Sequence, residues 1–210
     1  ILLPSTVKDF GEEAFQNCTS LTSMDISNAT YVRDNCFDGC INLETVTFSN
    51  TMTSLGNYAF QNCTKLRSIY IPTTLTSIRV GVFKGCASLT TVSIPNSITS
   101  IGTNAFEDCT NIQTISMSSK VTTIGEYAFN NCSSLKSITL YSTLTTLGSY
   151  AFHDCASLTS ITVPSKVTSL SSYVFAGCSN LETISINGSI TRIYDYAFYN
   201  CYKLKSINIP

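Results

Sequence analysis

Ten cysteines carry most of the chemical reactivity in this 210-residue chain. Nine of them recur every 23 residues, apart from one 22-residue interval between Cys18 and Cys40. Thiols at equivalent places in a repeat lie about 4.8 Å apart with parallel side chains, which is not the geometry of a disulfide. We therefore expect buried free thiols that act as small apolar fillers at a tight turn. A disulfide or metal-binding role stays open for Cys36 and Cys40, which lie four residues apart.

His153 is the only histidine and therefore the first candidate for a general base. It lies two residues before Cys155, in a repeat position that elsewhere holds Gln, Asp, Lys, Glu, Asn, Ala and Tyr. A position that accepts such different side chains is expected to face solvent. The sequence has no second His, no Gly-x-Ser-x-Gly turn, no Cys-x-x-Cys pair and no phosphate-binding Gly loop. It therefore predicts no catalytic residue, no metal site and no cofactor.

These positions belong to a repeat that runs from Cys18 to Cys201. Each copy carries Phe three residues before Cys, and Asn, Gly or Asp directly before Cys. Apolar residues follow three, six and eight residues after Cys. A period of this length indicates a solenoid in which every coil stacks on its neighbours. We predict an α/β repeat solenoid of about nine 23-residue repeats that forms a single domain over residues 1–210.

Each repeat contains distinct local signals. The apolar residues six and eight after Cys predict a short strand, and all five prolines occupy the position that follows it. A second short extended arm comes next, as in residues 121–125, and often ends in Gly, which Arg33, Arg79, Ser171 and Tyr194 replace elsewhere. Around Phe we predict one helical or 3-10 turn, because Asn, Gly and Asp tolerate the left-handed conformation that ends such a turn. The Phe side chains should then stack as an interior column.

The pattern Leu-x-x-Ile-x-Ile-Pro followed by Val-Thr-x-Ile-Gly-x-x-Ala-Phe-x-x-Cys resembles the BspA-type leucine-rich repeats of bacterial and protist cell-surface proteins. The resemblance covers the whole chain. It implies a curved, right-handed solenoid with short parallel strands on the concave face and the helical or 3-10 segments on the convex side. It also implies an extracellular, cell-surface location and a role in adhesion. Because the chain opens in mid-repeat with Ile1-Leu2-Leu3-Pro4, we expect a fragment of a longer protein.

Charge and hydropathy argue against two classes of partner. Charged residues make up 12% of the chain and the formal net charge is -1. The chain therefore has no basic field to attract nucleic acid or anionic lipid. No stretch approaches the roughly 18 apolar residues that a membrane span needs. We expect neither nucleic-acid binding nor direct membrane insertion by this fragment.

The outward side of the predicted strand is the first candidate binding surface. The residue five after Cys is Ser or Thr in every repeat, and the residue seven after Cys is mostly small and polar. Such hydroxyl rows often serve only cross-strand packing, but a weakly charged sheet face also suits a protein or glycan partner. Less regular residues on and beside this face would provide specificity: Glu44, Arg67, Tyr70, Gln113, Lys136, Glu182 and Lys205.

Tyrosines form the second candidate surface. They occupy the position five residues before Cys in four consecutive repeats: Tyr127, Tyr150, Tyr173 and Tyr196. Tyrosine provides rigid contact area together with a polar group and is enriched at interfaces. Simple stacking on the convex side of the solenoid, or contact with the next repeat of the parent protein, is the alternative explanation.

These observations predict a non-enzymatic adhesion scaffold at the cell surface. Its partner would be an extracellular-matrix, host-cell or microbial surface protein, or a glycan. One alternative is a structural spacer that projects another domain from the surface. The other is an ice-ordering surface made of pairs such as Thr45 and Thr47, although Ser often replaces Thr, and Asp25 and Tyr70 interrupt the array.

Overall fold

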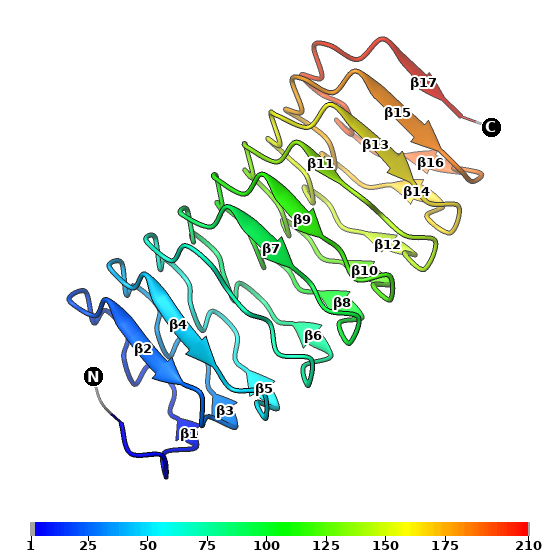
Figure 1. Cartoon of the computed structure of the whole chain (residues 1–210). Coiled ribbons are helices and arrows are strands. Elements are labelled where there is room, and N and C mark those ends of the chain that lie inside the picture. The colour runs from blue at the N-terminus through cyan, green and yellow to red at the C-terminus, as the bar shows by residue number, and fades with distance from the viewer. Residues whose placement is uncertain (1–2, 210) are drawn as a thin grey trace.

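The computed structural model describes residues 3–209, which form a solenoid of stacked coils (Figure 1). Within this range the chain contains seventeen short β-strands and no helix. The strands form two rows along the solenoid. The first row contains β2 (Ser23–Ile26), β4 (Thr45–Phe48), β7 (Thr91–Ser93), β9 (Thr114–Ser116), β11 (Ser137–Ile138), β13 (Ser160–Val163), β15 (Thr183–Ile186) and β17 (Ser206–Asn208). The second row contains β1 (Asp9–Phe10), β3 (Tyr31–Val32), β5 (Ser54–Leu55), β6 (Ser77–Ile78), β8 (Ser100–Ile101), β10 (Thr123–Ile124), β12 (Thr146–Leu147), β14 (Ser169–Leu170) and β16 (Arg192–Ile193).

The strand pairs among the described residues are parallel and join equivalent positions of successive coils. Between β13 and β15, for example, Ser160 pairs with Thr183, 23 residues later. The first row is divided into three sheets, β2-β4, β7-β9-β11 and β13-β15-β17. Residues 68–71, which lie between β4 and β7 in the chain, form no strand. The register confirms the predicted stacking of the repeats, but the first row is not one continuous sheet.

The strands alternate between buried and exposed side chains as predicted. In β13, Ile161 and Val163 are buried, whereas Ser160 and Thr162 are exposed. Pro164 follows this strand directly, and its carbonyl accepts a hydrogen bond from the Val167 amide at 3.1 Å. The proline therefore ends the strand and starts a turn, because its ring fixes φ and removes a donor. Pro210 lies outside the described residues.

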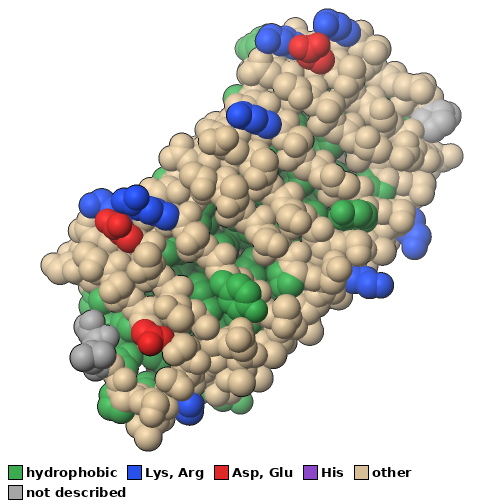
Figure 2. All heavy atoms as spheres, viewed as in Figure 1, with side chains coloured by type: hydrophobic (Ala, Val, Ile, Leu, Met, Phe, Trp, Pro, Cys, Tyr) green, Lys and Arg blue, Asp and Glu red, His purple; other side chains and the backbone are tan. Residues whose placement is uncertain are grey.

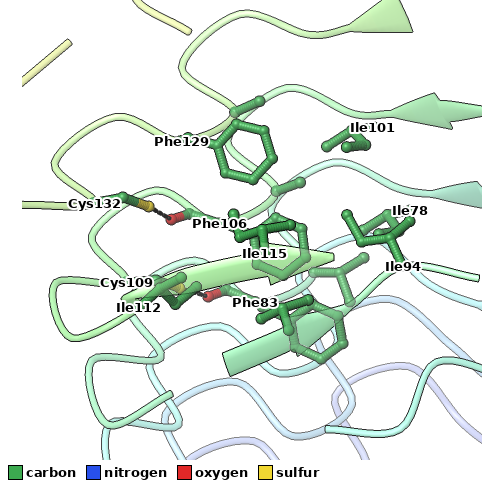
Figure 3. Close-up of a cluster of buried hydrophobic side chains, with 14 of the residues drawn as sticks. Ile78, Phe83, Ile94, Ile101, Phe106, Cys109, Ile112, Ile115, Phe129 and Cys132 are labelled. Atoms are coloured by element: carbon green, nitrogen blue, oxygen red, sulfur yellow. Dashed lines mark hydrogen bonds between the residues drawn. The ribbon is translucent and has the colours of Figure 1, made fainter. Parts of the chain in front are cut away.

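The nine phenylalanines that precede Cys form the interior column that the repeat predicts. Neighbouring ring centroids from Phe15 to Phe198 are 5.1–6.0 Å apart, and the ring planes differ by 3–19°. Figure 3 shows three of these rings, Phe83, Phe106 and Phe129, one above the other among buried isoleucines. Only the rings of the two end coils are partly exposed. The column is thus the continuous apolar centre of the solenoid.

The prediction of a helical or 3-10 turn around each Phe is wrong, because the described residues contain neither. The segment instead consists of turns in which backbone amides alternate between two kinds of acceptor. The amides of Tyr127 and Phe129 donate to Ser149 and Ala151 of the next coil at 3.0 and 2.9 Å. The amide between these two, that of Ala128, closes a local turn onto the Gly125 carbonyl at 3.4 Å. In a helix, all of these amides would donate to carbonyls of the same segment.

Left-handed residues explain why no helix forms. In the described residues, the positions one and five before Cys have φ between 54° and 73° in every coil. The first of these positions holds the Asn, Gly or Asp whose left-handed conformation the sequence predicts. The second is unexpected, because it holds these residues: Glu13, Asn35, Tyr58, Gly81, Asn104, Tyr127, Tyr150, Tyr173 and Tyr196. Two left-handed residues only four positions apart interrupt any run of right-handed helical conformation.

A search for membrane-spanning helices finds none among the residues that the structure describes.

Candidate binding surfaces

The strand face consists of the residues five and seven after each Cys. All of these residues from Ser23 to Asn208 are exposed. Figure 2 shows this side of the solenoid, on which uncharged side chains and backbone cover most of the area and most charged side chains lie near the margins. The predicted row of outward hydroxyl groups is therefore confirmed. It makes a long and weakly charged surface along the first row of strands.

The charged and amide residues beside this face meet in pairs across neighbouring coils. Arg67 Nη2 lies 3.3 Å from Glu44 Oε2, and Lys205 Nζ lies 3.0 Å from Glu182 Oε2. Lys136 Nζ donates to Gln113 Oε1 at 3.5 Å. The six residues thus form three separate pairs in the column four residues after Cys, not one cluster.

Each pair is exposed to solvent and therefore contributes little to folding. A hydrogen bond from Lys205 lowers the pKa of Glu182 below its ordinary value, so this carboxylate stays charged at neutral pH. The Glu182–Lys205 pair consequently presents fixed charges at the margin of the strand face. Charges at such a position affect the choice and orientation of a partner more than the binding energy.

Tyr70 stands out on the strand face because it is large and 49% exposed. It belongs to residues 68–71, the segment that interrupts the first row of strands. In the columns beside the face, Lys65, Arg67, Ser88, Thr90 and Asn111 line a shallow hollow of about 530 Å³. Thr90 places a short side chain between Arg67 and Gln113 of the neighbouring coils, but Thr22 and Thr159 are equally short in the same column, so the sequence carries no distinct signal for this hollow.

The four consecutive tyrosines stack on one another. Ring centroids are 4.5 Å apart for Tyr127 and Tyr150, 4.5 Å for Tyr150 and Tyr173, and 4.7 Å for Tyr173 and Tyr196. The first three rings are partly buried, and Tyr196 is 57% exposed. The stack is flanked by Tyr199, whose ring meets that of Tyr196 edge-on at 5.7 Å. Because most ring faces cover each other, the stack presents mainly ring edges and hydroxyl groups to solvent.

The second row of strands has a hollow at either end, where side chains replace the usual Gly. At a typical coil, a Cβ on Gly125 would lie 2.6 Å from the Thr103 nitrogen of the preceding coil, so glycine allows close packing there. Near one end, Arg33 and Arg79 help to line a hollow of about 270 Å³. Near the other end, Tyr194 helps to line one of about 240 Å³. The departures from Gly that the sequence shows therefore coincide with the hollows of this side.

The Arg33 hollow is lined by opposite charges. Asp9 accepts hydrogen bonds from Arg33 Nε at 2.9 Å and from Nη2 at 2.6 Å. Glu12, Asp34 and Arg79 line the same hollow. At the other end, the Arg192 guanidinium lies 4.3 Å from the ring centroid of Tyr194. These hollows combine aromatic, cationic and acidic groups without a single dominant charge.

The cysteines are free thiols, as the sequence predicts, and all except Cys18 and Cys201 are fully buried. Each thiol from Cys40 onward donates a hydrogen bond to the carbonyl of the Phe in the preceding coil. Cys109 donates to Phe83 at 3.1 Å and Cys132 to Phe106 at 3.3 Å (Figure 3). Burial raises the pKa of these thiols. They therefore remain protonated and unreactive at neutral pH.

Cys36 and Cys40 are also buried free thiols. Burial raises the pKa of Cys36 to about 12 and that of Cys40 to about 11. Over the described range, no group of three or more His, Cys, Asp or Glu side chains is arranged to hold a metal ion. The two thiols thus act in this structure as part of the apolar interior.

The column that contains His153 is not simply solvent-facing, so this expectation is wrong. Its middle members are half-buried and hydrogen-bonded from coil to coil. Lys84 Nζ lies 2.7 Å from Glu107, Asn130 donates to Glu107 at 3.0 Å, and His153 Nδ1 lies 2.8 Å from Asn130 Oδ1. The residue types in this column differ because each side chain complements its neighbours in adjacent coils, and not because the position lacks contacts. His153 is accordingly held by Asn130, and its ring edge lies against Tyr150.

The short parallel strands, the stacked coils and the repeated Leu, Ile and Phe positions define a leucine-rich-repeat solenoid. The sequence pattern of the BspA type leucine-rich repeat region matches the chain in six copies over residues 1–113 and 99–210. The chain belongs to this family. No curated protein matches it.

Solved structures support the same fold. A leucine-rich repeat protein from Bacteroides ovatus shares 30% sequence identity with a TM-score of 0.72, and the match covers 96% of this chain and 58% of that one. This chain therefore spans less than two thirds of that protein's length. A leucine rich cell surface protein from Faecalibacterium prausnitzii shares 24% identity with a TM-score of 0.64, over 99% of this chain and 79% of that one. At this identity the second likeness supports the fold alone.

Proposed function

We propose that this chain is a non-enzymatic scaffold that binds a host or matrix protein at a cell surface through its strand face. The observation that carries the proposal is the unbroken exposure of both outward columns from Ser23 to Asn208. The similar protein from Faecalibacterium prausnitzii is described as a cell surface protein, and we extend that location to this chain. Leucine-rich repeats of this family are a scaffold suited to protein interaction.

The strand face has the physical character of a recognition surface. Its Ser and Thr hydroxyl groups both donate and accept hydrogen bonds, and their short side chains lose little conformational entropy on binding. Protein interfaces bury about 800 Å² per partner, an area that several coils together can provide. We therefore expect the binding energy to be spread over many coils.

Tyr70 and Arg67 are the proposed centre of this surface. Interface energy concentrates at aromatic and Arg residues that a partner covers. Tyr70 offers a half-exposed ring, and Arg67, three residues before it in the chain, lines the hollow that also contains Lys65. The three charged or polar pairs beside the face would set the orientation of the partner. The tyrosine column remains a proposed second contact, and its available area is limited to ring edges and to Tyr196.

A binding assay with matched variants tests this proposal. We would immobilise purified extracellular-matrix proteins and measure binding of the whole chain by surface plasmon resonance. The Arg67→Ala/Tyr70→Ser double variant should bind at least about tenfold more weakly than the unmodified chain. The Arg79→Ala/Tyr31→Ser variant removes the same residue types from the second row of strands and should bind within about twofold.

Equal binding by both double variants would contradict the strand-face site. If the unmodified chain binds none of the matrix proteins offered, the spacer is the better explanation. In that case the repeats would serve to hold another domain away from the surface. A thermal-hysteresis measurement on the same preparation tests the ice-ordering alternative.

A further inference from the structure

The tyrosine stack places four phenol rings in direct contact at the surface of the molecule. Centroid separations of 4.5–4.7 Å and interplanar angles of 7–19° describe nearly parallel rings. The residues are 23 positions apart in the chain, so each contact joins two successive coils. No other column among the described residues brings tyrosines together in this way.

The backbone holds the four tyrosines at this spacing. Each has a left-handed φ between 54° and 59°. The amide of Tyr127 donates to Ser149 and that of Tyr150 to Ser172, both at 3.0 Å, and that of Tyr173 donates to Asp195 at 3.1 Å. Every coil is therefore bonded to the next at the residue that carries the ring. The backbone positions that carry the rings therefore stay at the spacing of the coils as long as these inter-coil hydrogen bonds persist.

We propose that this stack is a site of oxidative cross-linking, in which neighbouring tyrosines join to form dityrosine. The oxidant is hydrogen peroxide activated by a haem peroxidase. Two phenols each lose one electron and one proton and become phenoxyl radicals. The radicals combine by forming one carbon–carbon bond between ring carbons ortho to the oxygens, and the two ortho hydrogens then move to the oxygens. Overall, two tyrosines and one peroxide give one dityrosine and two waters.

The geometry favours coupling within the chain over other outcomes. Rotation about the Cβ–Cγ bond turns two stacked rings so that their ortho edges face each other. The directly linked rings of dityrosine have centroids about as far apart as the rings here, so the stack already holds the rings at the separation that the product needs. Reaction within one molecule also benefits from the high effective concentration of groups that are already held together.

Competing groups are less available to the oxidant. The Cys thiols are the strongest potential reductants of the chain, but seven of the nine in the Cys column are buried, and burial raises the pKa of those near the stack. These buried thiols are therefore neither exposed nor ionised. Cys201, which lies in the coil of Tyr196, is partly exposed, but burial raises its pKa to about 11, so it too stays protonated at neutral pH. The stack, in contrast, reaches solvent, with Tyr196 the most exposed of its four members.

Tyr58 provides an internal comparison. It occupies the same column and has a φ of 55°, but the neighbours in its column are Asn35 and Gly81. A Cβ on Gly81 would lie 2.2 Å from two carbon atoms of the Tyr58 ring, so this ring rests on the glycine of the next coil. Tyr58 therefore has the same backbone setting as the stack without a phenol partner, and it should not couple within the chain.

The number of adjacent pairs predicts the yield. The unmodified stack can form two links, for example one between Tyr127 and Tyr150 and one between Tyr173 and Tyr196. The Tyr127→Phe/Tyr196→Phe variant keeps one adjacent pair, and the Tyr150→Phe/Tyr196→Phe variant keeps none. Both variants lose two hydroxyl groups and retain all four rings. The two variants therefore have the same number of tyrosines and differ only in whether two of those left in the stack are adjacent.

The experiment treats the purified chain, at a concentration low enough to disfavour dimers, with hydrogen peroxide and a haem peroxidase. Dityrosine fluorescence, intact mass and the masses of linked proteolytic peptides are the readouts. We expect a monomer that has lost two hydrogens per link, with links between tyrosines 23 positions apart. The variant with one pair should give about half the yield, and the variant without a pair should give only background.

Two results would overturn the proposal. One is equal intramolecular yield from the two double variants. The other is a product made up only of covalent dimers and larger species, which would assign the reaction to exposed tyrosines outside the stack such as Tyr202. Because the peptide masses of the unmodified chain locate the links directly, this second test does not depend on the folding of any variant. The outcome is also independent of binding at the strand face.

Discussion

The phenylalanine column inside the solenoid and the tyrosine column on its surface are both aromatic stacks, but different forces hold them. Phenylalanines occupy every coil with centroid separations of 5.1–6.0 Å. Stacked tyrosines occupy only the last four coils, at 4.5–4.7 Å. The phenylalanine rings thus lie farther apart from one another than the tyrosine rings do. Surrounding side chains hold them, whereas the left-handed backbone holds the tyrosines.

This difference shows where the chain tolerates change. The interior column keeps one residue type in all nine coils because burial of a large apolar side chain provides stability there. The tyrosine column accepts Glu, Asn and Gly as well, because the backbone conformation and not the side chain is the common requirement. Asn and Gly adopt that conformation easily, and Tyr does so at the expense of some strain.

Alkaline pH should produce the largest effect, because it acts on all buried thiols of the interior together. Burial raises the pKa of thiols such as Cys109 above its ordinary value of 9.0. Above pH 9.0 the unfolded chain loses thiol protons that the folded chain retains, so stability falls as pH rises. Each such thiol destabilises the folded state by up to about 1.4 kcal/mol per pH unit. We expect cooperative unfolding in this range, measured by circular dichroism during a pH titration.

A cysteine variant serves as the control for this titration. Cys109→Ala/Cys132→Ala removes two of the buried thiols and should therefore make the loss of stability with pH less steep. An unchanged titration curve would mean that ionisation of other groups, such as the tyrosines, causes the unfolding.

Truncation of a central phenylalanine should have the next largest effect. Phe106→Ala should lower the free energy of unfolding by about 3–5 kcal/mol, because it removes a fully buried ring and leaves a cavity in the column. Urea denaturation provides the measurement. Phe198→Ala is the matched change in a coil where the ring is only partly buried, and its effect should be smaller. Equal effects would show that burial is not what holds the column.

Substitution within the tyrosine column should matter less. Tyr150→Asn removes two stacking contacts and the edge contact with His153 but relieves the strain of a bulky left-handed residue, so the melting temperature should change by no more than about 4 °C. Tyr150→Ala removes the same contacts and keeps the strain, so it should melt at a lower temperature than Tyr150→Asn. Differential scanning calorimetry measures both. If Ala and Asn are equivalent, the left-handed backbone is not the feature that selects residues here.

Loss of a charge pair at the margin of the strand face should have the smallest effect on stability. Glu182→Gln removes the ion pair with Lys205, which is exposed and therefore weak. The melting temperature at neutral pH should change by less than about 1 °C. The pKa of Glu182 lies below its ordinary value of 4.5, so the contribution of the pair is present above that pH and disappears as pH falls through the lowered pKa. A large change in melting temperature at neutral pH would contradict the weak role assigned to this pair.

Several features of the fold could be predicted from particular residues of the sequence. The Phe column, the buried thiols, the left-handed residue before Cys and the outward Ser and Thr of the strands all lie where the repeat predicts. The helical turn was wrong because the second left-handed position holds residues such as Glu13 and Tyr127, whose types carry no signal for that conformation. The left-handed conformation of tyrosine at this position becomes evident only from the structure, which shows the hydrogen bonds of its backbone to the next coil.

The candidate surfaces were predictable in composition and not in arrangement. The sequence singled out Glu44, Arg67, Glu182 and Lys205, and the structure joins them as two ion pairs. It did not reveal the hollow beside Thr90 or the chain of hydrogen bonds that holds His153. Each of these depends on contacts between side chains of adjacent coils. The residue types at one repeat position do not predict such contacts.

By itself, the sequence determined the solenoid, because a 23-residue period requires equivalent side chains to lie over one another and leaves the apolar ones only the interior. The tertiary structure alone decided how the turns around Phe are built and which surface groups meet. Both depend on backbone hydrogen bonds and side-chain contacts between coils. Such contacts join residues one full repeat apart, and local sequence preferences do not determine them.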